Sequence, residues 1–79
     1  MNDVDVVGEV VGRTGPKVRL RIAERFAGNI GATVLVVAQI EDDTETVAAT
    51  VIGRPSAQII EIEMRGELFF QTKTLTLRR

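Results

Sequence analysis

The chain has 79 residues, of which 44% are hydrophobic and 27% are charged, and ten Lys and Arg against eleven Asp and Glu give a net charge of −1. This composition is that of one small soluble domain rather than a disordered chain, and the longest apolar run (residues 32–40) is far shorter than the roughly 20 residues that span a bilayer. The absence of Cys and His excludes disulfides, thiolate chemistry, and the commonest general base and zinc ligand. No signal peptide is recognisable, so a cytoplasmic protein is expected.

The first third of the chain predicts a β-hairpin. Residues 4–12 are rich in valine on both faces, which predicts a strand that is partly buried on both sides, with Gly8 typical of a bulge or a barrel corner. Residues 14–16 predict a turn. The strand that follows alternates between charged residues facing out and apolar residues facing in: Lys17, Arg19 and Arg21 against Val18, Leu20 and Ile22.

Residues 23–31 interrupt the β pattern. The first five predict one helical turn, ended by the Gly-Asn step that follows. Because five residues cannot hold a helix alone, we expect Phe26 and Ile30 to pack this turn against the domain. Residues 32–40 are apolar on both faces and are predicted to be the most buried strand.

Three more strands are predicted in the second half. They cover residues 46–53, 58–65 and 69–77, and the connections before them are residues 41–44, 55–56 and 66–67. Within residues 58–65, Glu61 and Glu63 face out while Ile60, Ile62 and Met64 face in. The alternation shifts inside the last strand, which predicts a bulge at residues 71–73.

Residues 9–13 and 50–54 are two copies of one pattern, an apolar strand that ends in Gly-Arg. The glycines are 41 positions apart (53 − 12), and the alternating strands that follow are 42 apart (60 − 18). We therefore predict that residues 1–79 form one all-β domain, a small six-stranded barrel built from two related hairpin units with one short helical turn. Closure is expected because an open sheet would leave two exposed edges.

Four basic residues, Arg13, Lys17, Arg19 and Arg21, are candidates for a nucleic-acid or partner contact, and Arg54 is a further member by position. Cations along one strand face can follow phosphates. The alternative is a solvated face whose cross-strand partners are the glutamates of the second copy. The acidic net charge and the presence of only three aromatic residues, all Phe, favour the alternative.

Two other patterns that suggest chemistry are better explained by structure. The acidic run Glu41, Asp42, Asp43 and Glu45 lacks the spaced ligands and glycine of a calcium loop, which favours a solubilising hairpin tip. Residues 12–17 resemble a phosphate loop, but a valine and a strand follow the lysine where Ser or Thr and a helix are needed. We expect no catalytic, cofactor-binding or metal-binding residues.

Thr72, Thr74 and Thr76 lie on one face of the last predicted strand. Such a face suits pairing with a neighbouring subunit, and an ordinary polar edge strand explains the pattern equally well.

The run from Gly8 to Gly12, the Ala-Glu-Arg at residues 23–25, Gly31 before the valine-rich strand, and residues 49–53 together resemble the small HAS-type barrel at the N-terminus of HerA-type DNA translocases. A related barrel heads the subunits of rotary ATPases. The resemblance implies a non-catalytic assembly module of a ring-forming ATPase, and it assigns no functional side chain. A cradle-loop or double-psi barrel also arises by duplication, but the Gly-Asp signature before its closing strand is missing.

We therefore expect a non-enzymatic barrel that assembles with copies of itself or with a partner protein. A small nucleic-acid-binding barrel that uses the basic strand face is the alternative.

Overall fold

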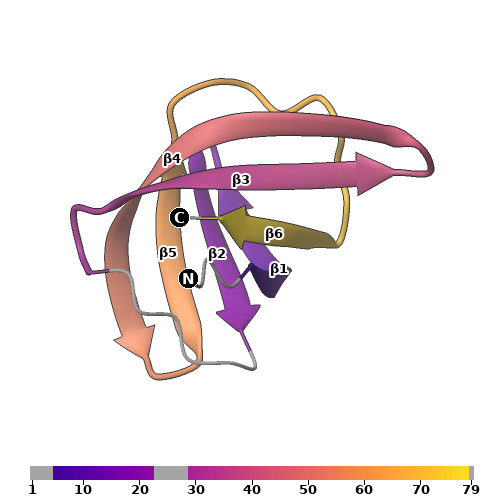
Figure 1. Cartoon of the computed structure of the whole chain (residues 1–79). Helices are drawn as coiled ribbons and strands as arrows, with labels where there is room; N and C mark the ends of the chain where they lie inside the picture. Colours follow the sequence, from indigo (N-terminus) through magenta and orange to yellow (C-terminus); the bar gives the residue numbers. More distant parts are fainter. Residues whose placement is uncertain (1–4, 23–28, 79) are drawn as a thin grey trace.

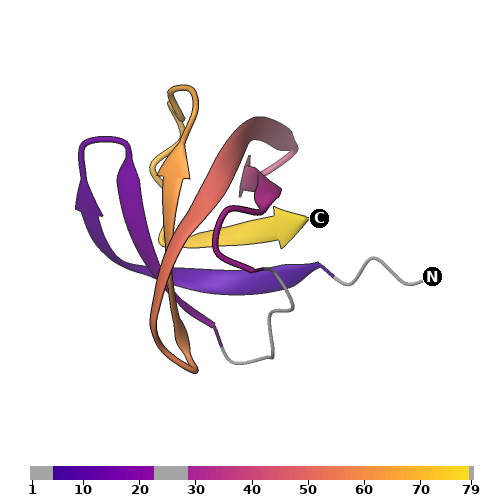
Figure 2. The ribbon, with the colours of Figure 1, turned by 90° about the vertical axis from the view of Figure 1, so that its left-hand side faces the viewer.

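Six antiparallel strands form a closed barrel (Figure 1; Figure 2). The computed structural model describes residues 5–22 and 29–78. The strands are β1 (Val6–Thr14), β2 (Lys17–Ile22), β3 (Thr33–Ile40), β4 (Asp43–Ser56), β5 (Ile59–Met64) and β6 (Thr74–Arg78). They are hydrogen-bonded in the order β1-β2-β5-β4-β3-β6, and β6 pairs back onto β1. The predicted all-β, six-stranded barrel is therefore confirmed, whereas the helical turn predicted after β2 falls on residues outside the described ranges.

Alternation along the strands fills the barrel interior with aliphatic side chains. The predicted inward residues of β2 and β5 are all buried: Val18, Leu20, Ile22, Ile60, Ile62 and Met64. No polar or charged residue is buried in the described part of the chain. Burial of each large aliphatic side chain contributes about 1.5–3 kcal/mol, so this interior is the main source of stability. Residues 5–22 and 29–78 contain no helix long and apolar enough to cross a membrane.

The strand register shows that the barrel consists of two equivalent halves, β1–β2–β3 and β4–β5–β6. Adding 41 to a residue number in β1 or β3 (53 − 12 = 41), or 42 to one in β2 (61 − 19 = 42), gives the equivalent residue in β4, β6 or β5. With these offsets, the strand pairing of the first half matches that of the second. Gly8↔Ile22 in the first half corresponds to Ala49↔Met64 in the second, and Gly12↔Arg19 corresponds to Gly53↔Glu61. Between the halves, Gly8↔Leu75 corresponds to Ala49↔Val34. The predicted repeat of two hairpins thus extends to three strands in each half.

A pseudo-two-fold axis relates these halves. It passes between β2 and β5 at the pair Arg19↔Glu61 and between β3 and β6 at the pair Val36↔Leu77, because each residue there pairs with its own counterpart (61 − 19 = 42; 77 − 36 = 41). Val36 and Leu77 are fully buried, whereas Arg19 and Glu61 lie on the outside of the barrel wall. The axis therefore has two surface ends, one over β2 and β5 and one over β3 and β6.

The bulges follow the same symmetry. The register of β1 against β2 shifts between Val10 and Gly12, and that of β4 against β5 shifts between Val51 and Gly53. No bulge occurs at Gly8, although the sequence allowed one there. A Cβ at Gly8 would lie 3.1 Å from the Cβ of Leu20, so this glycine serves the close approach of β1 to β2.

Two strands expected to be buried on both faces have only one buried face. Val7 in β1 is 58% exposed and Leu35 in β3 is 40% exposed. The strand without an exposed residue is β5, not β3. Both strands belong to a single-layer wall, so alternate residues point outwards even where they are apolar. Ile30 is 65% exposed, so its predicted packing is wrong, and Phe26 lies outside the described residues.

The strand β4 is longer than predicted. It includes the second half of the acidic connection predicted before it and the whole turn predicted at residues 55–56. The turns that flank β4 lie at residues 41–42 and 57–58. Its first part pairs with β3 and its second part with β5, so one bent strand forms a corner of the barrel (Figure 1). Pro55 is tolerated there because the register shifts again between Gly53 and Ser56.

Residues 65–73, which we call the strap, are not a strand. The predicted strand over residues 69–77 begins only at Thr74, and the bulge predicted at residues 71–73 is wrong for the same reason. Leu68 and Phe70 instead pack against the core, and the Phe70 N–H donates to Glu45 Oε1 at 2.9 Å rather than to a strand. The connection after β5 is therefore about as long as the one after β2, and not shorter as the sequence suggested.

Candidate interaction surfaces

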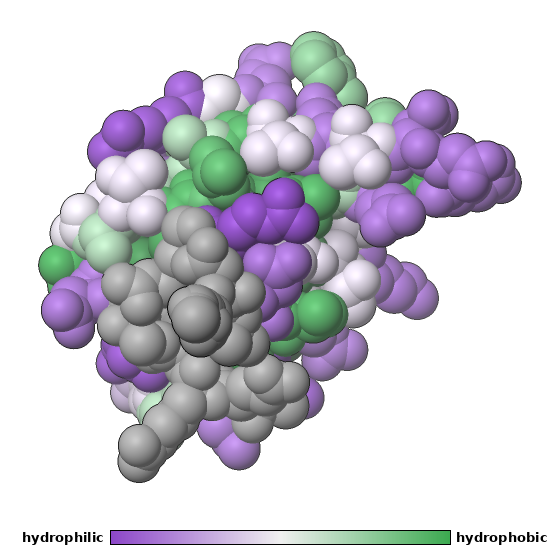
Figure 3. Space-filling model, viewed as in Figure 1, coloured by the Kyte–Doolittle hydropathy of each residue, from purple (hydrophilic) through white to green (hydrophobic). Residues whose placement is uncertain are grey.

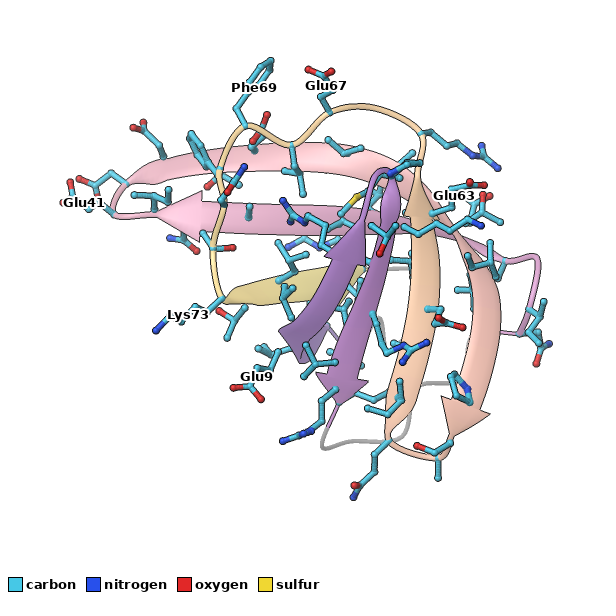
Figure 4. The ribbon with its side chains drawn as sticks, turned by 180° about the vertical axis from the view of Figure 1, so that it is seen from behind. Glu9, Glu41, Glu63, Glu67, Phe69 and Lys73 are labelled. Atoms are coloured by element: carbon cyan, nitrogen blue, oxygen red, sulfur yellow. The ribbon has the colours of Figure 1, made fainter. Side chains whose placement is uncertain are left out.

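Oppositely charged side chains cover the outside of β2 and β5 at one end of the axis. The three predicted cations of β2 have acidic neighbours: Glu61 for Arg19 (2.8 Å, Nη2 to Oε2), Glu9 for Arg21 (3.7 Å, Nη1 to Oε1) and, by register, Glu63 for Lys17. Figure 4 looks onto this surface, which we call the charged face. Its charges compensate one another, so it lacks the continuous positive strip that follows a phosphate backbone.

Arg13 does not belong to this row. After the bulge in β1, Arg13 stands directly opposite Val18, whose side chain is buried. Opposed residues of an antiparallel pair point to the same side of the sheet, so Arg13 is on the inner side of the β1–β2 hairpin, where the hairpin extends beyond the barrel. The bulge therefore separates Arg13 from Lys17, Arg19 and Arg21. Arg54 is exposed near the end of β4, at the equivalent place in the second half (54 − 13 = 41).

The other end of the axis carries small and aliphatic side chains. One row of directly paired, outward residues crosses four strands: Val7, Thr76, Val37 and Thr46. Leu35 and its partner Ala48 lie beside that row. We call these six residues the aliphatic face. Figure 3 shows green and near-white residues along β3 and β4 on this side, interrupted by strongly purple ones near the centre of the view, and further purple residues at the far tip of the β3–β4 hairpin.

Arg78 is the charged neighbour of the aliphatic face. It pairs with Leu35 across β6 and β3, and its guanidinium lies 3.2 Å from Asp5 Oδ2. A neutralised cation at the margin of an apolar patch is easier to cover than a free one, because less charge must be desolvated.

The three threonines predicted to form a pairing face do not lie on one strand. Thr74 and Thr76 are on the outer side of β6, and Thr76 lies in the aliphatic face. Thr72 belongs to the strap, where its hydroxyl donates to the Thr74 carbonyl at 2.6 Å. The predicted pairing face did not include the apolar residues around Thr76. A signal for them was present in the sequence, because residues 4–12 and 32–40 carry apolar side chains on both faces. In a one-layer wall that pattern indicates an apolar outer patch.

A groove of about 570 Å³ opens at the mouth of the barrel, between the tip of the β1–β2 hairpin and the strap. Its floor contains Val18 and Met64, both buried. Arg13 lines it on the hairpin side, and Glu67 and Phe69 line it on the strap side. Figure 4 shows Glu67 and Phe69 pointing away from the barrel body on the strap. The groove thus combines an apolar floor with one charge of each sign at its rims.

The acidic residues near the β3–β4 tip have structural roles in the described chain. Glu45 holds the strap through Phe70, and Glu41 and Asp42 form the turn. Among residues 5–22 and 29–78, no group of three or more acidic side chains is arranged to hold a metal ion.

Comparison with protein-family models, with curated proteins and with solved structures found no match for this chain. The function is therefore inferred from the surfaces themselves.

Proposed function

We propose that this chain is a non-catalytic β-barrel that assembles with further copies of itself or with a partner protein through the aliphatic face. The observation that carries the proposal is the exposure of Val7 and Leu35, 58% and 40%, in a patch that also contains Val37 and Thr76. Water-exposed aliphatic residues gathered on one side of a small domain are typical of a protein–protein interface.

The size of the domain supports the same proposal. A standard interface buries about 800 Å² on each partner, which is roughly a sixth of the 5137 Å² of accessible surface that this chain exposes. A domain of this length is only marginally stable alone, and assembly adds buried apolar area. Covering an aliphatic face stabilises the barrel without any change inside it.

The resemblance to HAS-type barrels leads to a finer proposal, an assembly module of a ring-forming ATPase or DNA translocase. What supports it here is the closed barrel of six antiparallel strands and an outward patch that exposes Val7 and Leu35. In this role the barrel holds neighbouring subunits or partners together, and the chemistry belongs to another domain.

Sedimentation velocity across the micromolar range tests the assembly. We expect the wild-type chain to self-associate and Leu35→Glu to remain monomeric, because a carboxylate in the patch would be buried without a partner. Gln58→Glu is the matched control, since it adds the same charge at an exposed position in the β4–β5 turn. A monomeric wild type contradicts assembly between copies, and equal loss of association in both variants contradicts assembly through this face.

Binding to a labelled single-stranded oligonucleotide at low salt tests the alternative. A nucleic-acid-binding barrel requires binding that falls steeply with salt and disappears when Arg19 and Arg21 become Glu. We expect neither, because both guanidinium groups already lie beside carboxylates.

A further inference from the structure

Within residues 5–22 and 29–78, no strand pairs with the outer edge of β1 beyond Val10, beside the groove at the barrel mouth. β6 pairs with β1 from Val6 to Glu9, and the last backbone bond on that side runs from the Val10 N–H to the Lys73 carbonyl at 2.8 Å. β1 continues to Thr14, and over this last part β2 is its neighbouring strand in the described chain. Unpaired peptide groups along a strand edge are a template for another extended chain.

The edge is open because the strap leaves β1 at Lys73. If β6 began several residues earlier, as its sequence suggested, it would cover this edge. Instead Phe70 is drawn towards the β3–β4 hairpin by its 2.9 Å bond to Glu45 and by contact with the core. The path of the strap therefore produces both the groove and the free edge.

The side chains around the edge define what the groove can hold. Val18 and Met64 form an apolar floor, and Phe69, 77% exposed, stands at the outer rim. Arg13 points to the floor side of the hairpin and has no ion pair within residues 5–22 and 29–78. A strand added to β1 would place one of its side chains beside Arg13, and the side chains two residues away on the same face would lie over the groove.

We infer that the groove binds an extended peptide segment of a partner protein by strand addition to β1. The segment carries an acidic residue beside Arg13 and, two positions away, an aliphatic or aromatic residue that covers the floor and contacts Phe69. This surface is separate from the aliphatic face, so the inference does not depend on the assembly proposed above.

A peptide suits these features better than a nucleic acid or a small ligand. Among the described residues that line the groove, a nucleic acid would meet one cation, Arg13, and the carboxylate of Glu67 on the opposite rim. A small ligand would leave the peptide groups of the β1 edge unpaired. An extended chain satisfies the edge, the apolar floor and Arg13 together.

The test begins with a displayed library of random peptides about twelve residues long, selected against the intact chain. We expect the selected peptides to share an acidic residue two positions from an aliphatic or aromatic one. A labelled selected peptide is then titrated by fluorescence anisotropy. Arg13→Glu should weaken its binding by tenfold or more, equivalent to about 1.4 kcal/mol, and Phe69→Ser should weaken it as well.

Lys17→Glu is the matched control, because it makes the same charge change on the opposite face of the same hairpin, and it should alter binding by less than about twofold. Amide shifts in NMR spectra should concentrate in residues 11–14 and in the strap. Leu35→Glu should abolish self-association yet leave peptide binding intact, so failure of either proposal is visible without the other. The inference is overturned if no peptide is selected or if Arg13→Glu leaves peptide binding unchanged. It is also overturned if the chain binds an oligonucleotide more tightly than the peptide and Arg13→Glu abolishes that binding.

Discussion

The two ends of the pseudo-two-fold axis are built from equivalent strands but have different surfaces. Over β2 and β5, the axis emerges between Arg19 and Glu61, and opposite charges surround it. Over β3 and β6, it emerges above the buried pair Val36 and Leu77, among outward aliphatic and threonine side chains. Under both ends, the interior is filled with buried hydrophobic side chains. The barrel thus shows that inward residues set the fold while outward residues on the same strands are free to specialise.

This difference has a physical meaning for association. A surface of compensated charges remains well hydrated, and covering it requires desolvation that its ion pairs regain only in part. An aliphatic surface loses little when it is covered. Covering the aliphatic face therefore costs less desolvation than covering the charged face, which is why the proposed assembly uses the former.

The largest effects are expected in the core that both ends share. Leu20→Ala, beneath the charged face, and Leu77→Ala, beneath the aliphatic face, should each destabilise the barrel by about 2–5 kcal/mol, because both side chains are completely buried. Urea unfolding followed by circular dichroism measures both losses. Losses that differ by more than about 2 kcal/mol would show that the two ends differ in their packing and not just on their surfaces.

A reversal of charge on the axis should have a smaller effect. Arg19→Glu places two carboxylates across from each other and should destabilise by about 1 kcal/mol, since the pair is partly exposed. The double variant with Glu61→Arg exchanges the two partners across the axis and should recover most of that loss. If the exchange does not restore stability in urea unfolding, the two sides of this pair are not equivalent.

A change at the tip of the β3–β4 hairpin should be smaller again and of opposite sign. Glu41 has a φ of 54°, a left-handed conformation that glycine adopts at little cost, so Glu41→Gly should stabilise the barrel by about 0.5 kcal/mol. Asp42→Gly is the control, because no positive φ occurs at that neighbouring position. Since this tip lies outside both faces, self-association should not change, and sedimentation checks this.

The smallest effect is expected from salt. Raising NaCl from about 50 to 500 mM screens exposed charges strongly but should change the self-association constant by less than about threefold, because the aliphatic face is apolar. The same titration monitored by sedimentation would show a steep loss if the charged face held the copies together.

Strand identity and the inward residues were predictable from the sequence wherever apolar and charged residues alternate. Val18, Leu20 and Ile62 belong to such strands, and the repeated Gly-Arg corner correctly indicated two related units. Runs that are apolar on both faces were misread, because Leu35 and Val7 suggested a covering layer that the described structure does not contain. Sequence patterns report hydrophobicity, but not whether a second layer exists.

Features that depend on distant contacts were not predictable. Residues 69–73 have strand-like composition, yet the bond from Phe70 to Glu45, 25 positions earlier in the chain, directs them away from β1. Likewise, Arg13 continues the basic row of β2 in the sequence, but the bulge in β1 turns its side chain to the other side of the hairpin. The groove at the barrel mouth depends on both events, so its residues could not be grouped by inspection of the sequence.

The ion pair on the axis has a consequence for the history of such a barrel. In a dimer of two identical three-stranded chains, a residue on the two-fold axis must face its own copy, so an arginine there would meet an arginine and a glutamate a glutamate. Either arrangement repels. Attraction between Arg19 and Glu61 becomes available only when the two halves differ in sequence at this position, as the two halves of one polypeptide can. The pair is therefore a mark of divergence between the two halves, an interaction that a symmetric assembly of identical chains cannot make.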